Sequence, residues 1–151
     1  MEWIHGDYYI SDDVRRLDID GIGALLAGSY WAADRSREVI DQSVAGSLCL
    51  GLYFGERQIG FARWITDRAT FAYLCDVIIA PEFRGQGLGK WLVECAISHP
   101  AVAHLSQMLA TRDAHGLYER YGFARSETMR RKPIAAVKRE ESRGTENESR
   151  F

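Results

Sequence analysis

The sequence predicts an α/β (α+β) domain in which helices flank a mixed, mostly antiparallel sheet, and three observations carry this prediction. Apolar residues recur at helical spacing in the first third of the chain. Strand-forming runs alternate with short turns in the middle third, as in an antiparallel meander. After Pro81, helical and strand patterns alternate, which makes a strand–helix–strand crossover. Such a crossover joins parallel strands, so part of the sheet should be parallel.

The first elements are a short strand over residues 8–10 and two helices. Apolar residues at positions 19, 22, 25 and 26 indicate a helix within residues 17–30, although its glycines weaken the pattern. A second helix is expected over residues 36–45. The segment between them, residues 29–32, reads Ser-Tyr-Trp-Ala and is expected to be a loop.

Three strands should follow, over residues 48–54, 58–66 and 70–79. The first pair is separated by Gly55-Glu56 and the second by Asp67-Arg68, which are typical turn residues. The third run is rich in aromatic and β-branched residues, which favour strands.

The helical pattern after Pro81 places Leu88, Trp91, Leu92 and Cys95 on one face. His99-Pro100 should end this helix. A strand over residues 102–110 is expected next.

A second helix should lead to Tyr121, because positions 114, 117, 118 and 121 repeat the helical spacing. Gly122 followed by Phe123 matches a Schellman-type helix end. A last strand is predicted over residues 128–132.

Composition indicates one globular domain and excludes several classes. The 151 residues carry 19 basic and 21 acidic side chains, a net charge of −2, so nothing favours nucleic acid or an anionic membrane as partner. No run is long and apolar enough for a membrane helix. Three cysteines without CxxC spacing indicate reduced core residues of a cytoplasmic protein, and no metal site is expected. Residues 1–137 form the predicted domain, and the charge-balanced residues 138–151 a solvated tail.

The most informative segment joins the third strand to the next helix and reads VIIAPEFRGQGLGK from Val77 to Lys90. Glycines allow positive φ angles and close approach of a ligand to the main chain. The following helix N-terminus offers N–H groups to an anion, and Arg84 and Lys90 add positive charge. A glycine-rich turn that only caps the helix is the alternative.

Two phosphate-binding motifs fail on this segment. The P-loop pattern would need glycine at Arg84 and Ser or Thr at Trp91, and the dinucleotide pattern ends on Lys90 or Leu92. Arg-x-x-Gly-x-Gly does fit, at positions 84, 87 and 89. This resembles the pyrophosphate loop of the GNAT family, the Gcn5-related N-acetyltransferases, which bind acetyl-CoA.

A second segment about twenty residues on also resembles this family. Ala114, Tyr118, Gly122 and Phe123 match its second cofactor motif, in the expected order. Thr111 stands where the family often has Asn, and Asp113 is a possible helix cap. The resemblance covers roughly residues 5–135 and implies the GNAT fold, with a parallel strand pair that splays apart. Neither motif carries information on the acceptor.

The resemblance implies direct acetyl transfer from acetyl-CoA to a primary amine, within a ternary complex. Tyr118 would protonate the departing sulfur, although it could instead be a core tyrosine. A backbone N–H near Val77 would polarise the thioester carbonyl, and the strand edge would hold the pantetheine arm. The residues expected to bind acetyl-CoA are Val77, Ile78, Ile79, Arg84, Gly85, Gln86, Gly87, Leu88, Gly89, Lys90, Asp113 and Tyr118.

The sequence offers more than one candidate for the group that takes the proton from the amine. Asp76 is a carboxylate in an otherwise apolar strand, so it is either a base or amine-binding charge, or a partner of Arg63 or of a backbone N–H. Tyr73 lies where some relatives carry a glutamate base, and a water chain could replace it. The acceptor pocket is predicted to include Tyr30, Trp31, Arg35 and Tyr73, although ordinary packing or a solvated charge would also explain the first three.

Two functions from different classes remain. The first is an N-acetyltransferase acting on a small-molecule amine or an exposed amino group, with no metal, no nucleic acid and no membrane, and with a homodimer allowed. The second is a non-catalytic acyl-CoA-binding sensor. Tyr118 favours the enzyme, because a pure binder needs no proton donor.

Overall fold

The computed structural model describes residues 1–134; the predicted tail, residues 138–151, and the last three residues of the predicted domain lie outside them. Helices and strands alternate largely in the predicted order. They are β1 (Glu2–His5), β2 (Tyr8–Ser11), the 3-10 turn Val14–Arg16, α1 (Ile19–Ala27), α2 (Arg37–Ala45), β3 (Leu48–Phe54), β4 (Arg57–Thr66), β5 (Phe71–Ile79), the 3-10 turn Pro81–Phe83, α3 (Leu88–Ile97), β6 (Ser106–Leu109) and α4 (His115–Glu119).

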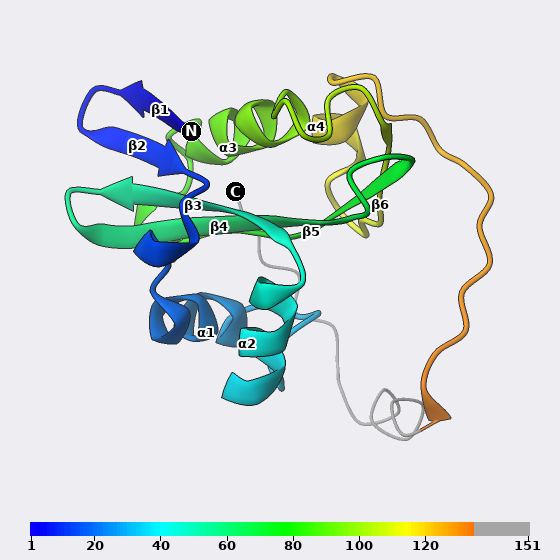
Figure 1. Cartoon of the computed structure of the whole chain (residues 1–151), viewed down its shortest axis with the longest axis horizontal. Coiled ribbons are helices and arrows are strands. Elements are labelled where there is room, and N and C mark those ends of the chain that lie inside the picture. The colour runs from blue at the N-terminus through cyan, green and yellow to red at the C-terminus, as the bar shows by residue number, and fades with distance from the viewer. Residues whose placement is uncertain (135–151) are drawn as a thin grey trace.

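The strands form one sheet in sequence order, β1-β2-β3-β4-β5-β6. All neighbours are antiparallel except β5 and β6, which are parallel. Helices α3 and α4 cover one face of the sheet, and α1 and α2 cover the other (Figure 1). The mixed, mostly antiparallel sheet with one parallel pair confirms the predicted fold class.

Two apolar cores lie on the two faces of the sheet. Leu48, Leu50 and Leu52 of β3 belong to the core under α3 and α4, whereas Cys49 between them belongs to the core under α1 and α2. This alternation follows from the two-residue period of a strand. A strand buried on both faces reads as a continuous apolar run, and β3 does so.

Side chains cap the N-termini of α1 and α2. The Asp18 carboxylate accepts the N–H of Gly21 at the start of α1, and the Ser36 hydroxyl accepts the N–H of Val39 at the start of α2. Such caps satisfy N–H groups that the first helical turn leaves without partners. The Ser36 cap lies at the α2 end of the loop between α1 and α2, which carries several predicted site residues.

The fold contains one strand that the sequence did not indicate. β1 pairs with β2 from Glu2↔Ser11 to His5↔Tyr8, and Gly6 in the turn has a φ of +60°. A glycine at the first position is typical of two-residue hairpin turns. The strand is mostly exposed, so it lacks the apolar alternation that reveals a buried strand.

Two predicted strands are wrong in whole or in part. The strand expected over 102–110 is confined to Ser106–Leu109, because Val102 and Ala103 turn back to bond the His99 carbonyl. The Val102 side chain is buried in the core and anchors this turn, which explains why the residue is apolar without being in a strand. Residues 128–132 form no strand in the described chain and are exposed, since Met129 is their only apolar side chain.

The predicted helix end after α4 is confirmed. The N–H of Phe123 donates to the Tyr118 carbonyl and that of Gly122 to the Glu119 carbonyl, the paired bonds of a Schellman motif. Gly122 has a φ of +86°, which this position requires. All three cysteines are free thiols, as expected.

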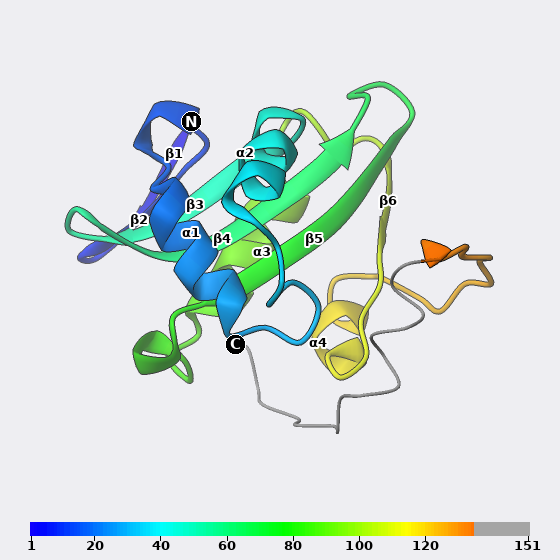
Figure 2. The same cartoon turned by 90° about the horizontal axis from the view of Figure 1, so that it is seen from below.

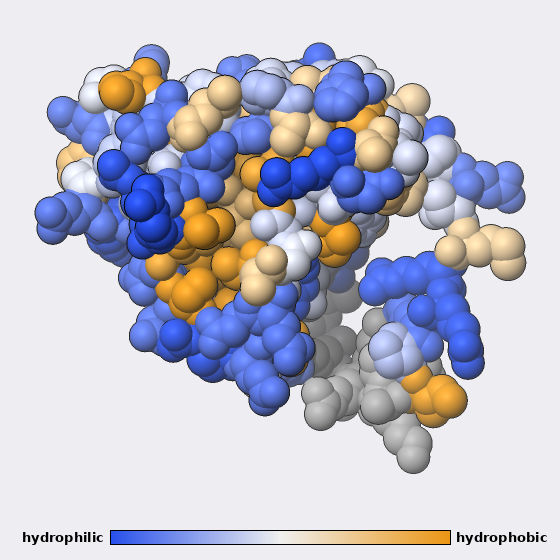
Figure 3. Space-filling model, viewed as in Figure 1, coloured by the Kyte–Doolittle hydropathy of each residue, from blue (hydrophilic) through white to orange (hydrophobic). Residues whose placement is uncertain are grey.

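The molecular surface in the view of Figure 3 is mainly hydrophilic, with an apolar strip between the layer of α3 and the layer of α1 and α2. No helix within residues 1–134 has the length and apolar character needed to cross a bilayer. Across the same residues, no group of three or more His, Cys, Asp and Glu side chains is placed to hold a metal ion.

Candidate active site

The two parallel strands separate halfway along β5. They pair from Phe71↔Ser106 to Leu74↔Leu109, where β6 ends, while β5 continues to Ile79. On its other side β5 stays paired with β4 as far as Gly60↔Ile79. In the described part of the chain, the edge of β5 from residue 75 to residue 79 therefore has no strand beside it. An extended, amide-containing ligand can add to such an edge.

The glycine loop at the end of β5 has the backbone that an anion site needs. Gly85 and Gly87 have φ angles of +77° and +81°, and a Cβ atom added to either would meet open space. Helix α3 starts with the bond from the Trp91 N–H to the Gly87 carbonyl, and no side chain caps it. The N–H groups of its first turn are therefore available to an anion.

The charged residues of the loop differ in their placement. The Arg84 Nε donates to the Ile79 carbonyl at 2.9 Å, so this side chain ties the loop to the end of β5. Lys90 is exposed in the first turn of α3. The open glycines, the free first turn and the adjacent cations together fit a diphosphate.

A residue of β2 also supports the loop, and the sequence did not indicate it. The Tyr8 hydroxyl donates to the Gln86 Oε1 at 3.2 Å, across 78 residues of chain. The Tyr8 ring also contacts the rings of Phe54 and Phe83. Contacts at such sequence separation depend on the sheet order and carry no local signal.

Helix α4 lies on the β6 side of the separated strands. The Ala114 N–H donates to the Thr111 Oγ1 at 3.0 Å, and Ala114 is the N-cap, so the prediction of Asp113 as the cap is wrong. The Thr111 hydroxyl can accept this bond because a side-chain oxygen three residues before a backbone N–H is within hydrogen-bonding reach of it. Tyr118 is 4% exposed, belongs to the core under α3 and contacts the Phe123 ring edge-on.

A β-bulge in β5 directs Asp76 away from the larger core. Phe61 pairs with Ile78 and Arg63 with Cys75, so Asp76 and Val77 together face the single residue between them in β4. Asp76 has a φ of +56°, a left-handed conformation that is rare for a residue other than glycine. Because of the extra residue, Leu74 and Val77 both face the core of α3, and the Asp76 carboxylate faces the opposite layer.

The Asp76 carboxylate is held by three donors. Arg35 Nη1 and Arg63 Nε donate to Oδ2 at 2.6 and 2.5 Å, and Trp31 Nε1 donates to Oδ1 at 2.9 Å. The side chains of Asp76, Arg63 and Arg35 are 0%, 9% and 24% exposed. The pairing with Arg63 that the sequence allowed is therefore present.

These contacts decide the protonation state of Asp76. Burial by itself raises the pKa of a carboxyl group, but the hydrogen bonds and positive charges of Arg35 and Arg63 outweigh it, and the pKa of Asp76 is lowered. A carboxylate that is ionised and surrounded by donors is a weak proton acceptor. The geometry favours an anchoring role for Asp76 over the role of base.

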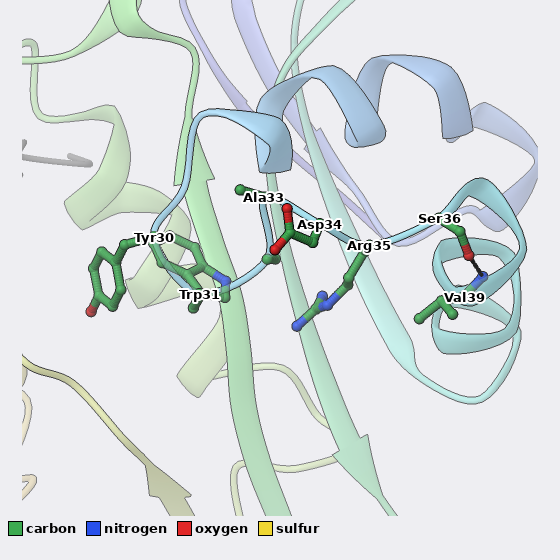
Figure 4. A pocket seen from close by; sticks show the side chains of 8 residues that line it. Tyr30, Trp31, Ala33, Asp34, Arg35, Ser36 and Val39 are labelled. Atoms are coloured by element: carbon green, nitrogen blue, oxygen red, sulfur yellow. Dashed lines mark hydrogen bonds between the residues drawn. The ribbon is translucent and has the colours of Figure 1, made fainter. Parts of the chain in front are cut away.

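The loop between α1 and α2 forms a pocket of about 320 Å³. Figure 4 shows Tyr30 and Trp31 at one end of this pocket and Ser36 and Val39 at the other, with Arg35 between them. The structure thus brings together Tyr30, Trp31 and Arg35, three of the residues predicted to bind the acceptor. Tyr73 does not line this pocket; it lies on β5, between Ile65 of β4 and Met108 of β6.

Comparison with known proteins identifies the family. Residues 45–125, more than half of the chain, match the family described as "Acetyltransferase (GNAT) domain". The chain therefore belongs to the GNAT family. A solved structure of a candidate GNAT acetyltransferase from Xanthomonas campestris pv. campestris is 41% identical, with a TM-score of 0.79 over 83% of this chain and 93% of that one.

Curated relatives include a candidate acetyltransferase from Gibberella zeae, 34% identical over 62% of this chain and 64% of that protein. The chloroplastic GCN5-related N-acetyltransferase 2 of Arabidopsis thaliana is 39% identical over 48% of this chain. The chain spans 64% of the first protein's length and 30% of the second's. The family assignment rests on the domain match over residues 45–125 and on the likeness to the Xanthomonas structure.

Proposed function

We propose that this protein is an acetyl-CoA-dependent N-acetyltransferase that moves the acetyl group to a primary amine by direct transfer in a ternary complex. The observation that carries the proposal is the open edge of β5, which leads directly into the glycine loop. An extended pantetheine arm would add to residues 77–79 and a diphosphate would reach the start of α3. The strand edge and the loop thus offer acetyl-CoA both a backbone edge for its pantetheine arm and N–H groups for its diphosphate.

Most of the residues expected to bind acetyl-CoA, from positions 77–79 and 84–90, belong to this strand edge and loop. Gly85 to Lys90 supply N–H groups, and Arg84 holds the loop in place. Tyr118 lies on α4 and Asp113 in the segment before it, and both are proposed to reach acetyl-CoA from the β6 side. The carbonyl of the acetyl group would accept a hydrogen bond from a backbone N–H near Val77, next to the bulge.

In the transfer, the amine nitrogen forms a bond to the acetyl carbon, and the bond from that carbon to sulfur breaks. Tyr118 gives its phenolic proton to the sulfur. The amine loses its proton to water, because Asp76 is engaged by Arg35 and Arg63. Asp76 then acts by fixing Trp31 and Arg35 of the acceptor pocket.

Direct transfer is favoured over a route through a cysteine. Cys75 is the thiol nearest to Asp76 in the chain, and burial raises its pKa to about 11. Its Sγ donates to the Arg63 carbonyl at 3.7 Å. A thiol that stays protonated at neutral pH is a poor nucleophile.

The test combines two measurements on the full chain. Acetyl-CoA at a hundred times its Kd should raise the Tm by about 5–10 °C through linkage. A screen of primary amines, read by release of the free thiol of CoA, should then give turnover. A Tm shift without turnover of any amine would favour the acyl-CoA-binding sensor, and the absence of a shift would exclude both functions.

The acceptor is proposed to be a small-molecule amine or an exposed amino group. The cytoplasmic location, the homodimer, and the absence of metal, nucleic acid and membrane partners stay predictions from the sequence.

A further inference from the structure

Two segments far apart in the sequence meet across the candidate site. The first is residues 28–36, called here the acceptor loop, and the second is residues 110–114, called the entry segment because it leads into α4. The Cζ of Arg112 lies 3.9 Å from the centroid of the Tyr30 ring. In Figure 2, seen from below, the connection between α1 and α2 projects next to α4, and the Arg112 contact joins this connection to the segment that leads into α4. The distance is well within the range of a cation–π interaction.

The contact is one end of a continuous series. The Tyr30 ring packs edge-on against the Trp31 ring, with centroids 5.0 Å apart. The Trp31 Nε1 in turn donates to the Asp76 carboxylate at the bulge of β5. A series of direct contacts thus joins the entry segment to the centre of the acceptor side.

The acceptor loop is anchored at both ends of its exposed part. Trp31 and Arg35 both bind Asp76, which fixes the loop at two points. Tyr30, with 40% of its surface exposed, is held from the side by Arg112. A partly exposed cation–π contact is weak enough to form and break, so the entry segment can control how well this end of the pocket is ordered.

We propose that Arg112 is a positioning residue that clasps Tyr30, so that acetyl-CoA bound beside α4 orders the acceptor pocket. This inference rests on the proposed function, because acetyl-CoA is expected to contact the entry segment at Asp113 and α4 at Tyr118. The guanidinium does not touch the reacting atoms. It acts through Tyr30, which lines the pocket.

The test is amide hydrogen exchange of residues 28–36 in the full chain, with and without acetyl-CoA. Without acetyl-CoA, Arg112→Ala should speed exchange in this loop by about threefold to fivefold, the change that an exposed cation–π contact supports. Arg120→Ala is the matched control, since it removes the same charge from the exposed end of α4. Arg112→Lys and Tyr30→Phe should retain most of the protection, because a cation and a ring remain.

Acetyl-CoA should slow exchange of the loop in the wild type and in Arg120→Ala, but not in Arg112→Ala. In a Tyr30→Leu background, Arg112→Ala should have no further effect. Equal exchange in Arg112→Ala and Arg120→Ala would overturn the clasp. A Tm shift by acetyl-CoA without slower exchange in the wild-type loop would overturn the coupling and leave the proposed function intact. If acetyl-CoA gives no Tm shift, the coupling fails together with the proposed function, and the comparison without acetyl-CoA still decides the clasp.

Discussion

The two sides of the candidate site are built in different ways. On the proposed acetyl-CoA side, the expected ligand-binding groups are backbone N–H groups of a glycine loop and of the first turn of α3, all within fourteen residues of chain from 77 to 90. On the acceptor side, Trp31, Arg35, Arg63 and Asp76 come from a loop and two strands. The first side depends on local backbone conformation, and the second on side chains that only the fold brings together.

This difference predicts how each side fails when it is changed. A substitution at Gly85 or Gly87 should remove binding with little loss of fold, because both glycines are exposed and a side chain there would face open space. A substitution in the Asp76 cluster should affect the stability of the whole domain, because its charges are buried and depend on each other.

The largest expected effect is that of Gly87→Glu, which should abolish the Tm shift by acetyl-CoA. A side chain at a φ of +81° is strained, and its carboxylate would repel a diphosphate at the start of α3. Gly6→Glu is the matched control, since Gly6 also has positive φ and open surroundings but lies in the β1–β2 turn. A normal shift in Gly87→Glu would contradict the assignment of the loop as the diphosphate site.

The next effect is on stability. Asp76→Asn should lower the free energy of unfolding by about 3 kcal/mol, the lower end for removing one charge of a buried ion pair. Chemical denaturation at pH 7 measures it. Because the pKa of Asp76 is lowered by folding, its stabilisation is present above the unfolded-state value of 3.8 and is lost as the pH falls through the lower folded-state pKa.

The stabilities of wild type and Asp76→Asn should therefore converge in strong acid. A constant difference between them at every pH would show that the carboxylate charge is not what stabilises the cluster.

Tyr118→Phe should lower kcat about a hundredfold, the lower range for loss of a general acid, while the Kd for acetyl-CoA stays nearly unchanged. The measurement uses whichever amine gives turnover in the screen. Tyr121→Phe is the control on the same helix end, where the hydroxyl donates to Glu94. If both variants have the wild-type rate and chemistry is rate-limiting, Tyr118 is not the acid.

The smallest effect is expected for Trp31→Phe, which removes the indole N–H from Asp76 and keeps an aromatic ring. The free energy of unfolding should fall by about 1.5 kcal/mol, the lower end for a hydrogen bond to a charged group. In the Asp76→Asn background the same substitution should cost clearly less. Equal losses in the two backgrounds would mean that Trp31 stabilises the loop only by packing.

Much of the backbone on the proposed acetyl-CoA side could be predicted from the sequence, because its determinants are local. Gly85 and Gly87 occupy positions where the backbone has a positive φ, a conformation that favours glycine. Gly122 has a positive φ as well, and with Phe123 it marks the end of α4. The apolar run of β3 and the helical spacing of α3 follow from burial at the periods of a strand and a helix.

The contacts within the proposed acceptor side appear only in the tertiary structure. The sequence raised Asp76 as an anomaly, but the choice between base and ion pair depended on a bulge that turns its carboxylate toward Arg35, Arg63 and Trp31. Arg112 gave no signal at all, since its partner Tyr30 is 82 residues away. Side-chain contacts across layers depend on register and strand order, and a one-residue change in register turns every side chain to the other face. For this reason the pattern of residues along the chain was enough to predict most helices and strands and the glycine loop. The partners of each buried charge could be identified only in the folded domain.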